Sequence, residues 1–432
     1  MLFTRDLRVH DNLALSTAAR EAERIVPLFV FDDAILGTAF ARPNRVAFLL
    51  DALRDLDASL TRRGGRLVLR SGDGVGETLA LAREVGADTV FVAEDASGYA
   101  QRRQHRLGEA CHADRIALRL TPGVTVAPLS SIEAGSGQHY RVFTPFYRAW
   151  SRAPRRPVES TPWRLPTPTG VSRGRLPALS RLVSGRPSLE LPPGGETAGR
   201  RRLSAWLRSG AAGYDAGHDD LAADATSRLS PYLHFGCISP LEVERRAAKL
   251  AGAAPFVRQL AWRDFFHQLL AARPETAHQD MRPRGARWND DPEALEAWKE
   301  GKTGYPIVDA GMRQLLREGY MHNRARLITA SFLVHDLRVD WRDGARHFFD
   351  WLVDGDVANN VGNWQWVAGT GANPRPFRAF NPLRQAHRFD PDGTYVRRYV
   401  PELAKIEGRA VHEPWKLREN ATEYPAPIVD RT

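Results

Sequence analysis

Hydrophobic and polar positions follow two different patterns along the chain, and the second pattern begins near residue 196. In the first part, short apolar runs alternate with segments whose apolar residues have helical spacing, such as residues 44–60. This alternation is typical of buried parallel strands covered by helices. It predicts an α/β doubly wound parallel sheet whose first strand is shortened to residues 1–3. The other strands are expected at residues 25–31, 66–69 and 89–93.

The second pattern is helical, and no segment of useful length alternates like a strand. Between the two patterns, nine prolines fall within residues 154–193 and exclude long regular elements there. We therefore expect an α/β domain, a proline-rich connector and a large all-α domain. Their expected bounds are residues 1–126, 127–195 and 196–432. Within the last, helices are expected at residues 203–206, 241–250, 256–270, 310–316 and 323–334.

Composition adds a charge argument with two interpretations. The 432 residues carry a formal net charge of +10, and the pI is about 9.9. Such a charge favours a polyanionic partner, because neutralising phosphates supplies much of the affinity for nucleic acids. However, only five of the 61 basic residues are lysines, so arginine-rich coding in a GC-rich genome explains the charge equally well.

The sequence carries no signal of a membrane or secreted protein. No apolar run approaches the length of a membrane span, and the first twelve residues are charged where a signal peptide is apolar. The two cysteines, Cys111 and Cys237, are too few for a disulfide framework. These features predict a cytoplasmic protein.

Two segments could bind a nucleotide, although each also has a structural interpretation. TSRLS, at residues 226–230, places hydroxyls and Arg228 at an expected helix start, where a phosphate could bind. A plainly capped helix is the more common case. Trp262 and Arg263 could stack on a base and pair with a phosphate, or simply pack against neighbouring helices.

Two further features are ambiguous in the same way. Arg324 and Arg326 could form buried ion pairs with the acids of residues 354–356, either around a cofactor or in a structural network. The chain has 11 tryptophans, which are usually core residues. An oxidisable indole can also pass a radical cation to a neighbouring one, but the sequence does not show which indoles are neighbours.

Several motifs, found in the expected order, resemble the photolyase and cryptochrome family along nearly the whole chain. FTRDLRVHDNLAL and VFTPFYRAW resemble the first domain of that family. The flavin domain is represented by TSRLSPYLHFG, AWRDFF, KTGYPIVDAGMRQL, MHNRARLITASFLVHDL and DGDVANNVGNWQWVAGTG. So many matches in one order are specific, whereas a single motif would prove little. Within the family, the chain resembles the class I cyclobutane pyrimidine dimer photolyases.

The resemblance implies a folded FAD, active as FADH⁻, inside the helical domain. Asn360 is expected to face flavin N5, where an amide can bond to the reduced ring without adding negative charge. Plant cryptochromes typically carry Asp there and animal ones Cys, so Asn favours a repair enzyme. The implied FAD-binding residues are Tyr214, Thr226, Ser227, Arg228, Leu229, Ser230, Arg263, Asn323, Arg326, Asp354, Gly355, Asp356 and Asn360.

The resemblance also implies an electron-transfer chain that runs from Trp364 through Trp341 to Trp288 at the surface. Trp262 and Trp366 are expected to clamp a dimer flipped out of the duplex, which costs less for a badly paired lesion. Excited FADH⁻ would donate an electron to the dimer, the cyclobutane ring would open and the electron would return. No metal or general base is required. The implied substrate and DNA contacts are Gln259, Trp262, Asn323, Arg324, Trp366 and Gln385.

Three positions depart from the class I pattern. Gln259 stands where Glu usually contacts the thymine imides, Leu327 where Met is common, and His218 where an Arg contact to DNA is common. The (6-4) photolyases carry Gln at the first position, but they also need two active-site histidines, where this sequence has Asn323 and Leu327. We interpret the departures as variation among dimer photolyases.

The α/β domain is expected to hold an antenna chromophore. PNRVAFLLDALRDL, at residues 43–56, resembles the deazaflavin type more than the folate type. We therefore expect 8-hydroxy-5-deazaflavin rather than methenyltetrahydrofolate, with contacts from Arg45 and Asp95. The resemblance also implies a monomer in a bacterial cytoplasm, associated with the nucleoid when it is bound to DNA containing pyrimidine dimers.

Two other functions compete with light-dependent repair of these dimers. A cryptochrome, which is a blue-light flavin photosensor without repair activity, would carry a long C-terminal extension and a residue other than Asn at position 360. The sequence shows neither feature. A DNA-binding protein with a purely structural flavin would have no use for the chain of tryptophans.

Overall fold

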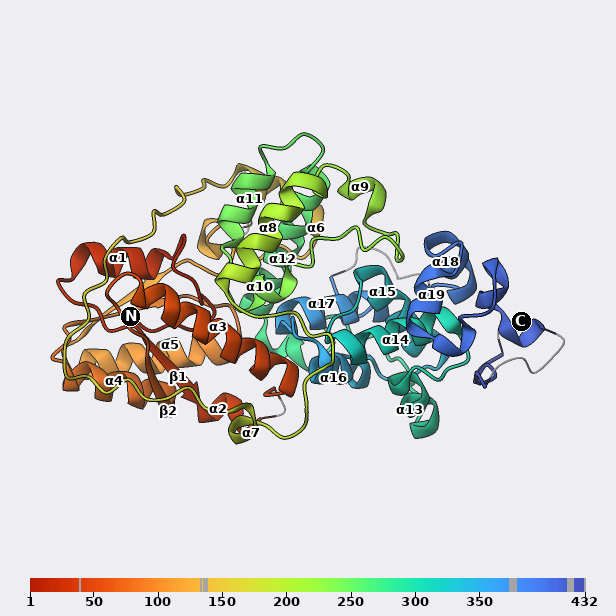
Figure 1. Cartoon of the computed structure of the whole chain (residues 1–432), viewed down its shortest axis with the longest axis horizontal. Helices are drawn as coiled ribbons and strands as arrows, with labels where there is room; N and C mark the ends of the chain where they lie inside the picture. The colour runs from red at the N-terminus through yellow and green to blue at the C-terminus, as the bar shows by residue number, and fades with distance from the viewer. Residues whose placement is uncertain (39, 133, 135–138, 373–378, 418–422, 431–432) are drawn as a thin grey trace. The chain divides into compact units, whose positions relative to one another are not determined.

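The structure is a computed structural model that describes residues 1–38, 40–132, 134, 139–372, 379–417 and 423–430 (Figure 1). Packing divides the chain into two compact units. The first unit contains Met1–Pro187, Pro192–Ala212 and Ser227–Glu275, and the second contains Ser188–Leu191, Gly213–Thr226 and Thr276–Thr432. These units follow packing, whereas the three expected domains follow the order of the chain, so the three domain bounds stay a prediction.

The first unit combines the strands with the helices that cover them and with four helices from the middle of the chain. Its elements are α1 (Leu13–Glu21), β1 (Leu28–Asp32), α2 (Asp33–Leu36), α3 (Pro43–Thr61), β2 (Val68–Gly72), α4 (Gly74–Glu84), β3 (Thr89–Ala93), α5 (Gly98–Ala113), β4 (Ala117–Thr121), η1 (Leu129–Ser131), α6 (Phe143–Arg152), α7 (Leu179–Leu182), α8 (Glu196–Ser209), α10 (Ser230–His234), α11 (Pro240–Ala247) and α12 (Ala254–Ala272).

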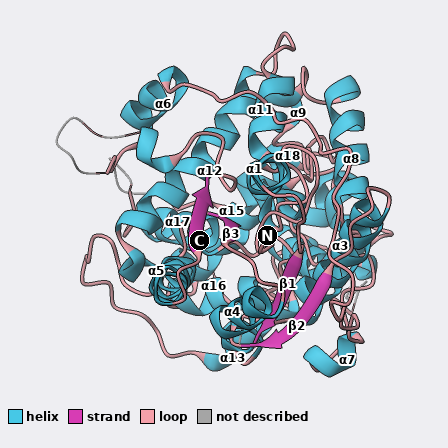
Figure 2. Ribbon diagram, turned by 90° about the vertical axis from the view of Figure 1, so that its left-hand side faces the viewer, coloured by secondary structure: helices cyan, strands magenta, loops and turns pink. Residues whose placement is uncertain are grey.

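The sheet is parallel and doubly wound, as expected from the sequence. β1 pairs with β2, and β3 pairs with β4. Leu2 bridges both Leu28 of β1 and Val92 of β3, so the N-terminal segment lies between these strands (Figure 2). The strand order is therefore β2, β1, the segment at Leu2, β3 and β4. The chain adds β1 and β2 on one side of the segment at Leu2 and β3 and β4 on the other, as in other doubly wound sheets. The expected short first strand is reduced to this one residue.

The strand predictions succeed where both faces are buried. β1 is buried at all five positions, and β3 is buried at four of five, as is usual for parallel strands covered on both sides. β4 was not predicted, because three of its five residues are exposed and its apolar pattern is weak. Within the part of the chain that the structure describes, strands occur only in this first unit.

The second unit is helical, as expected, and packs around one hydrophobic core. α14 shows why: Pro306 occupies its first turn, its buried face includes Val308, Met312 and Leu315, and Gly319 ends it with a left-handed φ of 62°. Its elements are α9 (Tyr214–Gly217), α13 (Pro292–Glu300), α14 (Pro306–Glu318), α15 (Asn323–Ser331), η3 (Phe332–Asp336), α16 (Trp341–Trp351), α17 (Val357–Ala368), α18 (Pro382–Phe389), α19 (Thr394–Tyr399), η4 (Pro401–Leu403), η5 (Gly408–His412) and η6 (Pro414–Lys416), and η2 (Pro274–Ala277) lies at the boundary of the two units.

One expected helix changes type before its end. The sequence predicted a helix over residues 323–334, whereas α15 ends at Ser331 and continues as a π-helical turn, η3. Such turns insert one residue into a helix without breaking it. Among the described residues, no helix combines the length and the apolar character needed to cross a bilayer.

Candidate active site

The residues implied by the family resemblance fall into both units. The first unit contains Arg45, Asp95, Ser227, Arg228, Leu229, Ser230, Gln259, Trp262 and Arg263. The second contains Tyr214, Thr226, Trp288, Asn323, Arg324, Arg326, Trp341, Asp354, Gly355, Asp356, Asn360, Trp364, Trp366 and Gln385.

A buried ion pair joins α15 to the turn before α17. Nη2 of Arg326 lies 2.9 and 3.1 Å from the two carboxylate oxygens of Asp354, whose side chain is only 3% exposed. Nε of Arg326 donates to the carbonyl oxygen of Met321 at 2.8 Å, and its guanidinium lies over the ring of Tyr320. The sequence predicted that Arg324 and Arg326 could pair with this acidic segment. The structure confirms the pair for Arg326, whereas Arg324 pairs with Asp219 instead. Removing either partner would leave a buried charge, so the pair fixes both side chains.

α17 presents three of the predicted residues at intervals of four. Asp356 caps the helix, because its Oδ1 accepts from the backbone N–H and the side-chain amide of Asn359, at 2.9 and 2.8 Å. Asn360 and Trp364 follow on the same side. The amide nitrogen of Asn360 donates to the carbonyl oxygen of Ala345 on α16 at 3.1 Å. This bond fixes the amide plane and leaves the side-chain oxygen as its acceptor group.

Trp364 packs against the face of α16 that begins with Trp341. Its ring centre lies 5.0 Å from that of Phe348 in an edge-to-face arrangement. A Cβ at Gly344 would collide with the Trp364 ring, so only glycine at this position allows such a close approach. Trp341, Gly344 and Phe348 are spaced by three and four residues and share one face. Trp341 and Trp364 both belong to the hydrophobic core of this unit.

Trp341 is buried in a charged environment. Its indole N–H donates to Oδ1 of Asp280 at 2.9 Å, and its exposure is 1%. Nη2 of Arg342 donates to the same oxygen at 2.7 Å, and its guanidinium carbon lies 4.7 Å from the centre of the indole ring. Arg342 also pairs with Asp340 at 3.1 Å. One cation and two anions therefore surround this indole.

Trp288 is half-buried and packs on the edge of the same core. Its neighbour Asn289 donates its backbone N–H to Arg338 and its amide to Leu337, at 2.7 and 3.0 Å. These bonds place Trp288 beside the segment that leads into Trp341. The second unit therefore brings together all three tryptophans predicted to form a chain.

The 226–230 segment is not a plainly capped helix. Leu229 occupies the N-cap of the short α10 and provides no side-chain bond, while Arg228 adopts a left-handed φ of 49°. The carbonyl oxygen of Ser227 accepts from Nε of Arg202 at 2.9 Å. The hydroxyl oxygen of Thr226 is buried and has no hydrogen-bond partner among the described residues. A buried hydroxyl in this condition is a candidate ligand contact.

Tyr214 and its neighbours lie on the short α9. The rings of Tyr214 and His218 stack with their centres 4.9 Å apart, and Nδ1 of His218 lies 3.0 Å from the carbonyl oxygen of Tyr214. Burial raises the pKa of the Tyr214 hydroxyl above its ordinary value, and the nearby Tyr320 and Asp219 raise it further. The phenol therefore stays protonated at neutral pH and can act as a hydrogen-bond donor.

In the first unit, Trp262 is stacked flat on Phe143. Their ring centres are 3.7 Å apart, and the rings are 4° from parallel. Arg258, one turn earlier on α12, lies over the rings of Phe143 and Tyr147, 5.0 Å from each centre. Trp262 remains half-buried and the nearby Gln259 is exposed. The stack holds the indole plane and occupies one of its two faces.

Arg263 points to backbone carbonyl groups of the same unit. Its Nη1 donates to Val124 at 2.6 Å, and its Nη2 donates to Leu233 at 3.4 Å. The adjacent Asp264 is buried and accepts from the indole of Trp150 at 2.9 Å. Burial raises the pKa of the Asp264 carboxyl, and the neighbouring Arg263 opposes that rise.

The predicted DNA contacts of the second unit differ in how they are held. Asn323 is exposed at the start of α15. Arg324 forms a two-point ion pair with Asp219, at 2.5 and 3.0 Å, and lies over the ring of Phe389. The side-chain oxygen of Gln385 is buried without a hydrogen-bond partner among the described residues. Trp366 is half-buried on α17.

The two predicted antenna contacts lie at the carboxyl edge of the sheet, where doubly wound folds bind ligands. Asp95 follows β3 and accepts from Nη1 of Arg5 at 3.2 Å. Arg45, in the first turn of α3, donates to the carbonyl oxygen of Phe40. Tyr99 at the same edge donates to Asp32, and its burial and this bond raise the pKa of its hydroxyl.

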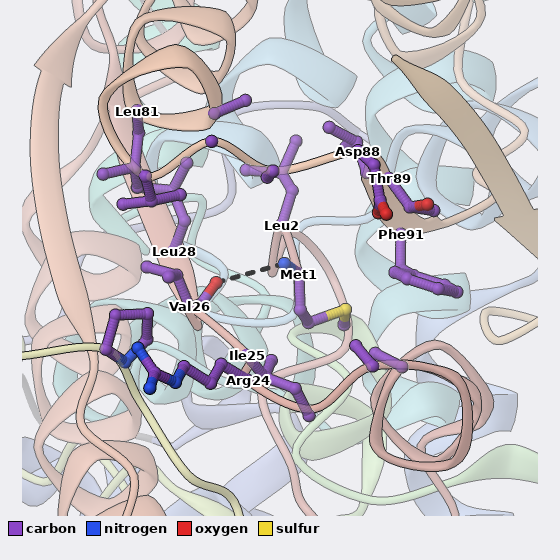
Figure 3. A pocket seen from close by; sticks show the side chains of 18 of the residues that line it. Met1, Leu2, Arg24, Ile25, Val26, Leu28, Leu81, Asp88, Thr89 and Phe91 are labelled. Atoms are coloured by element: carbon purple, nitrogen blue, oxygen red, sulfur yellow. Dashed lines mark hydrogen bonds between the residues drawn. The ribbon is translucent and has the colours of Figure 1, made fainter.

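A cavity of about 560 Å³ lies at the opposite, amino edge of the sheet (Figure 3). It is lined by the segments before β1 and β3, and the Met1 ammonium group donates to the carbonyl oxygen of Val26 at its edge. Burial lowers the pKa of this amine to about 5, although Asp6 opposes the shift. None of the predicted site residues lines the cavity, so we assign no role in the site to it.

Sequence reasoning missed the partners that hold the predicted tryptophans. Asp280 lies in an irregular segment between η2 and α13, with no periodic pattern to mark it. Phe143 belongs to the VFTPFYRAW motif, but its stacking on Trp262 joins helices far apart in the chain. Only the folded structure shows these pairs.

Comparison with known proteins agrees with this arrangement. Residues 1–166 match the family model described as DNA photolyase, and residues 256–432 match the model described as FAD binding domain of DNA photolyase. The matches to these two models identify the chain as a flavoprotein of the photolyase and cryptochrome class.

Similar proteins span the whole chain. The deoxyribodipyrimidine photo-lyase of Streptomyces griseus is 50% identical over 437 residues, which cover 100% of this chain and 96% of the relative. That of Halobacterium salinarum is 39% identical, with coverages of 99% and 95%. A class III photolyase structure from Agrobacterium tumefaciens superimposes with a TM-score of 0.92 at 36% identity, with coverages of 100% and 94%. The chain belongs to the DNA photolyase family.

Proposed function

We propose that the protein is a deoxyribodipyrimidine photo-lyase, which repairs cyclobutane pyrimidine dimers in DNA when illuminated. The observation that carries this proposal is the 50% identity to such an enzyme across the whole chain. Asn360 at the position implied to face flavin N5 supports repair over photosensing. A cryptochrome structure from Synechocystis sp. has a similar fold, with a TM-score of 0.91 but an identity of 28%.

The residues present fit FAD. The buried hydroxyl of Thr226, unpaired among the described residues, gains a partner if a ligand group lies beside it. The fixed amide of Asn360 offers an oxygen that would accept a bond from a ring N–H. When bound, reduced FAD supplies the electron that opens the cyclobutane ring and afterwards recovers it. The proposed contacts remain those of the family resemblance, from Tyr214 and residues 226–230 to Asn360.

The chain's own side chains would hold the cofactor in three ways. The ion pair with Asp354 fixes the position of the Arg326 guanidinium. Asp356 locks the first turn of α17, and therefore the direction in which Asn360 points. Trp364, which is 2% exposed, excludes water from its side of the helix. The site is thus organised before a ligand binds, which lowers the cost of binding.

For the substrate, we propose that Trp262 and Trp366 contact the flipped dimer. Phe143 holds the Trp262 indole flat, so a pyrimidine can stack without first ordering that ring. Gln259 is exposed one turn earlier on α12 and could bond to the pyrimidine edge through either end of its amide. Asn323, Arg324 and Gln385 are proposed as further DNA contacts.

We further propose that the enzyme is of class I and binds a deazaflavin antenna at the carboxyl edge of the sheet. Two buried side-chain donors there, Nε of Arg103 and Nε2 of Gln104, have no partner among the described residues. Related structures differ in both respects: one is a class III photolyase from Agrobacterium tumefaciens, and another, an archaeal photolyase from Sulfolobus tokodaii, holds two FAD molecules. Mass spectrometry of chromophores extracted from the purified protein would identify the antenna.

We also propose that the protein acts as a monomer in a bacterial cytoplasm and joins the nucleoid when it binds damaged DNA. The net charge of +10 supports contact with a polyanion. Light scattering of the purified protein would measure its mass, and a mass of two chains would contradict the monomer.

Repair of thymine-dimer DNA under blue light tests the function directly. We expect dimers to disappear in the light and persist in the dark, and Trp366→Ala to slow repair by weakening stacking. Protein that holds reduced FAD and binds damaged DNA without repairing it would overturn the proposal and favour a photosensor.

A further inference from the structure

We propose that Asp280 directs electron transfer to Trp341 by stabilising the positive charge that forms on this indole. The proposal deepens the proposed function, because it rests on the chain of Trp364, Trp341 and Trp288. It concerns the recovery of the reduced cofactor by light and not the repair step.

The geometry around Trp341 suits a radical cation. A carboxylate oxygen of Asp280 accepts the indole N–H at 2.9 Å, while the ring is 1% exposed. In such a site, water screens the charge poorly, so an adjacent anion has a large effect on it. Arg342 over the ring face opposes the charge, but Asp280 and Asp340 both pair with Arg342. The three ionic groups together leave a net charge of one negative unit beside the indole.

A second buried tryptophan provides the contrast. Trp298 lies beside Trp364 as well, with ring centres 6.2 Å apart, and its exposure is 0%. Its indole N–H donates to a peptide carbonyl, that of Thr329, at 3.0 Å. Burial, together with the charge of Lys299, lowers the pKa of the adjacent His347 to about 4, so this imidazole is neutral at pH 7. Trp298 therefore has a neutral acceptor where Trp341 has an anionic one.

The electron transfer balances without any bond being made or broken. With oxidised FAD bound, Trp364 would give one electron to the light-excited flavin and would become a radical cation. Trp341 then gives one electron to Trp364, which returns to a neutral indole, and the positive charge moves to Trp341. The N–H proton stays on Nε1 and remains bonded to the carboxylate. Trp288 next reduces Trp341, and a thiol reductant in solution reduces Trp288.

The test uses three variants of the complete protein carrying oxidised FAD. Asp280→Asn keeps a hydrogen-bond acceptor and removes the charge, Asp280→Glu restores the charge, and Arg342→Gln removes the opposing cation. Asp343→Asn is the matched control, because Asp343 lies on α16 and pairs at the surface with Arg346, at 3.1 Å. Flash excitation followed by transient absorption measures the yield of the tryptophan radical cation, and near-ultraviolet circular dichroism of flavin-free protein checks the packing.

We expect Asp280→Asn to lower the radical yield about tenfold. Even with protein screening, the interaction energy between a unit charge this close and the radical cation exceeds the energy that corresponds to a tenfold change. Asp280→Glu should recover most of the yield, Arg342→Gln should equal or exceed the wild type, and the control should not change. Equal losses in Asp280→Asn, Asp280→Glu and Arg342→Gln would mean that the cluster only positions Trp341, and would overturn the proposal. An unchanged yield in Asp280→Asn would overturn it as well.

A separate assay keeps this result distinct from the proposed function. Protein reduced chemically with dithionite should repair dimers at the wild-type rate in Asp280→Asn, because the repair step does not use the chain of Trp364, Trp341 and Trp288. Loss of repair in the wild type would contradict the photo-lyase, whereas loss of repair only in Asp280→Asn would contradict the role given to Asp280.

Discussion

Asp11 in the first unit and Asp356 in the second are both buried acids, at 0% and 6% exposure, but they are held in opposite ways. Asp11 collects donors from distant parts of the sequence, namely Arg156 at 2.5 and 3.1 Å, the backbone of Glu159 at 2.7 Å and the hydroxyl of Ser239. Asp356 accepts from Asn359, three residues further along the chain.

The difference separates an acid that joins distant segments from one that caps a single helix. Through its long-range donors, Asp11 links the N-terminal loop to the connector and to α11. Both oxygens of its carboxylate accept hydrogen bonds. The local bonds of Asp356 order the first turn of α17, the helix that carries Asn360. Burial alone therefore does not reveal which acid serves a ligand.

The largest effect is expected from Asp11→Ala. The substitution leaves the guanidinium of Arg156 without its counter-charge, and losing one partner of a buried pair costs about 3–5 kcal/mol. Urea unfolding should show this loss. Asp343→Ala, which breaks an exposed pair with Arg346, should cost less than about 0.5 kcal/mol. Similar losses in both variants would mean that the Asp11 contacts are not cooperative.

Asp356→Ala is expected to lower the stability less than Asp11→Ala does, and to lower the amount of bound FAD. Removing this cap should cost about 1 kcal/mol of unfolding free energy. FAD content, measured by flavin absorbance after gel filtration, should fall by about tenfold, which corresponds to about 1.4 kcal/mol. Asp291→Ala is the control: Asp291 caps α13 through Ala294 at 2.9 Å, so the variant should lose similar stability and keep its FAD. Equal FAD loss in both variants would refute a specific role for Asp356.

The smallest effect is expected from Phe143→Leu, which removes the aromatic partner of Trp262 but keeps an apolar side chain. Aromatic pairs contribute about 0.5–1.5 kcal/mol beyond their buried area, so affinity for dimer-containing DNA should fall about threefold. Affinity for undamaged DNA should not change, and Phe143→Tyr should bind like the wild type. Fluorescence anisotropy measures both affinities, and an equal loss for damaged and undamaged DNA would argue against a role in lesion recognition.

The sequence predicted most of the elements that position this site. The expected helix over residues 44–60 corresponds to α3, and the expected strand over residues 89–93 corresponds to β3, because apolar spacing reports burial directly. β4 escaped prediction since its side chains are largely exposed. The π-helical turn after Ser331 also escaped, because an inserted residue barely disturbs the apolar pattern.

For the site, the sequence indicated which residues take part better than it indicated which residues they contact. The sequence suggested that Arg326 could pair with the acids near residue 354, and the ion pair with Asp354 bears this out. It could not show that Asp219 holds Arg324 or that Asp280 bonds to Trp341. Such pairs depend on loops with no periodic pattern, and they form only after distant helices have packed.

The hydrogen atom that serves as the side chain of Gly344 sets the distance between the backbone of α16 and the Trp364 ring. A methyl group there would collide with Trp364, so the helix face and the indole would have to move apart. Electron tunnelling slows exponentially as the gap between donor and acceptor widens. In the proposed chain, the absence of one carbon atom therefore helps to set how fast an electron crosses from α16 to α17.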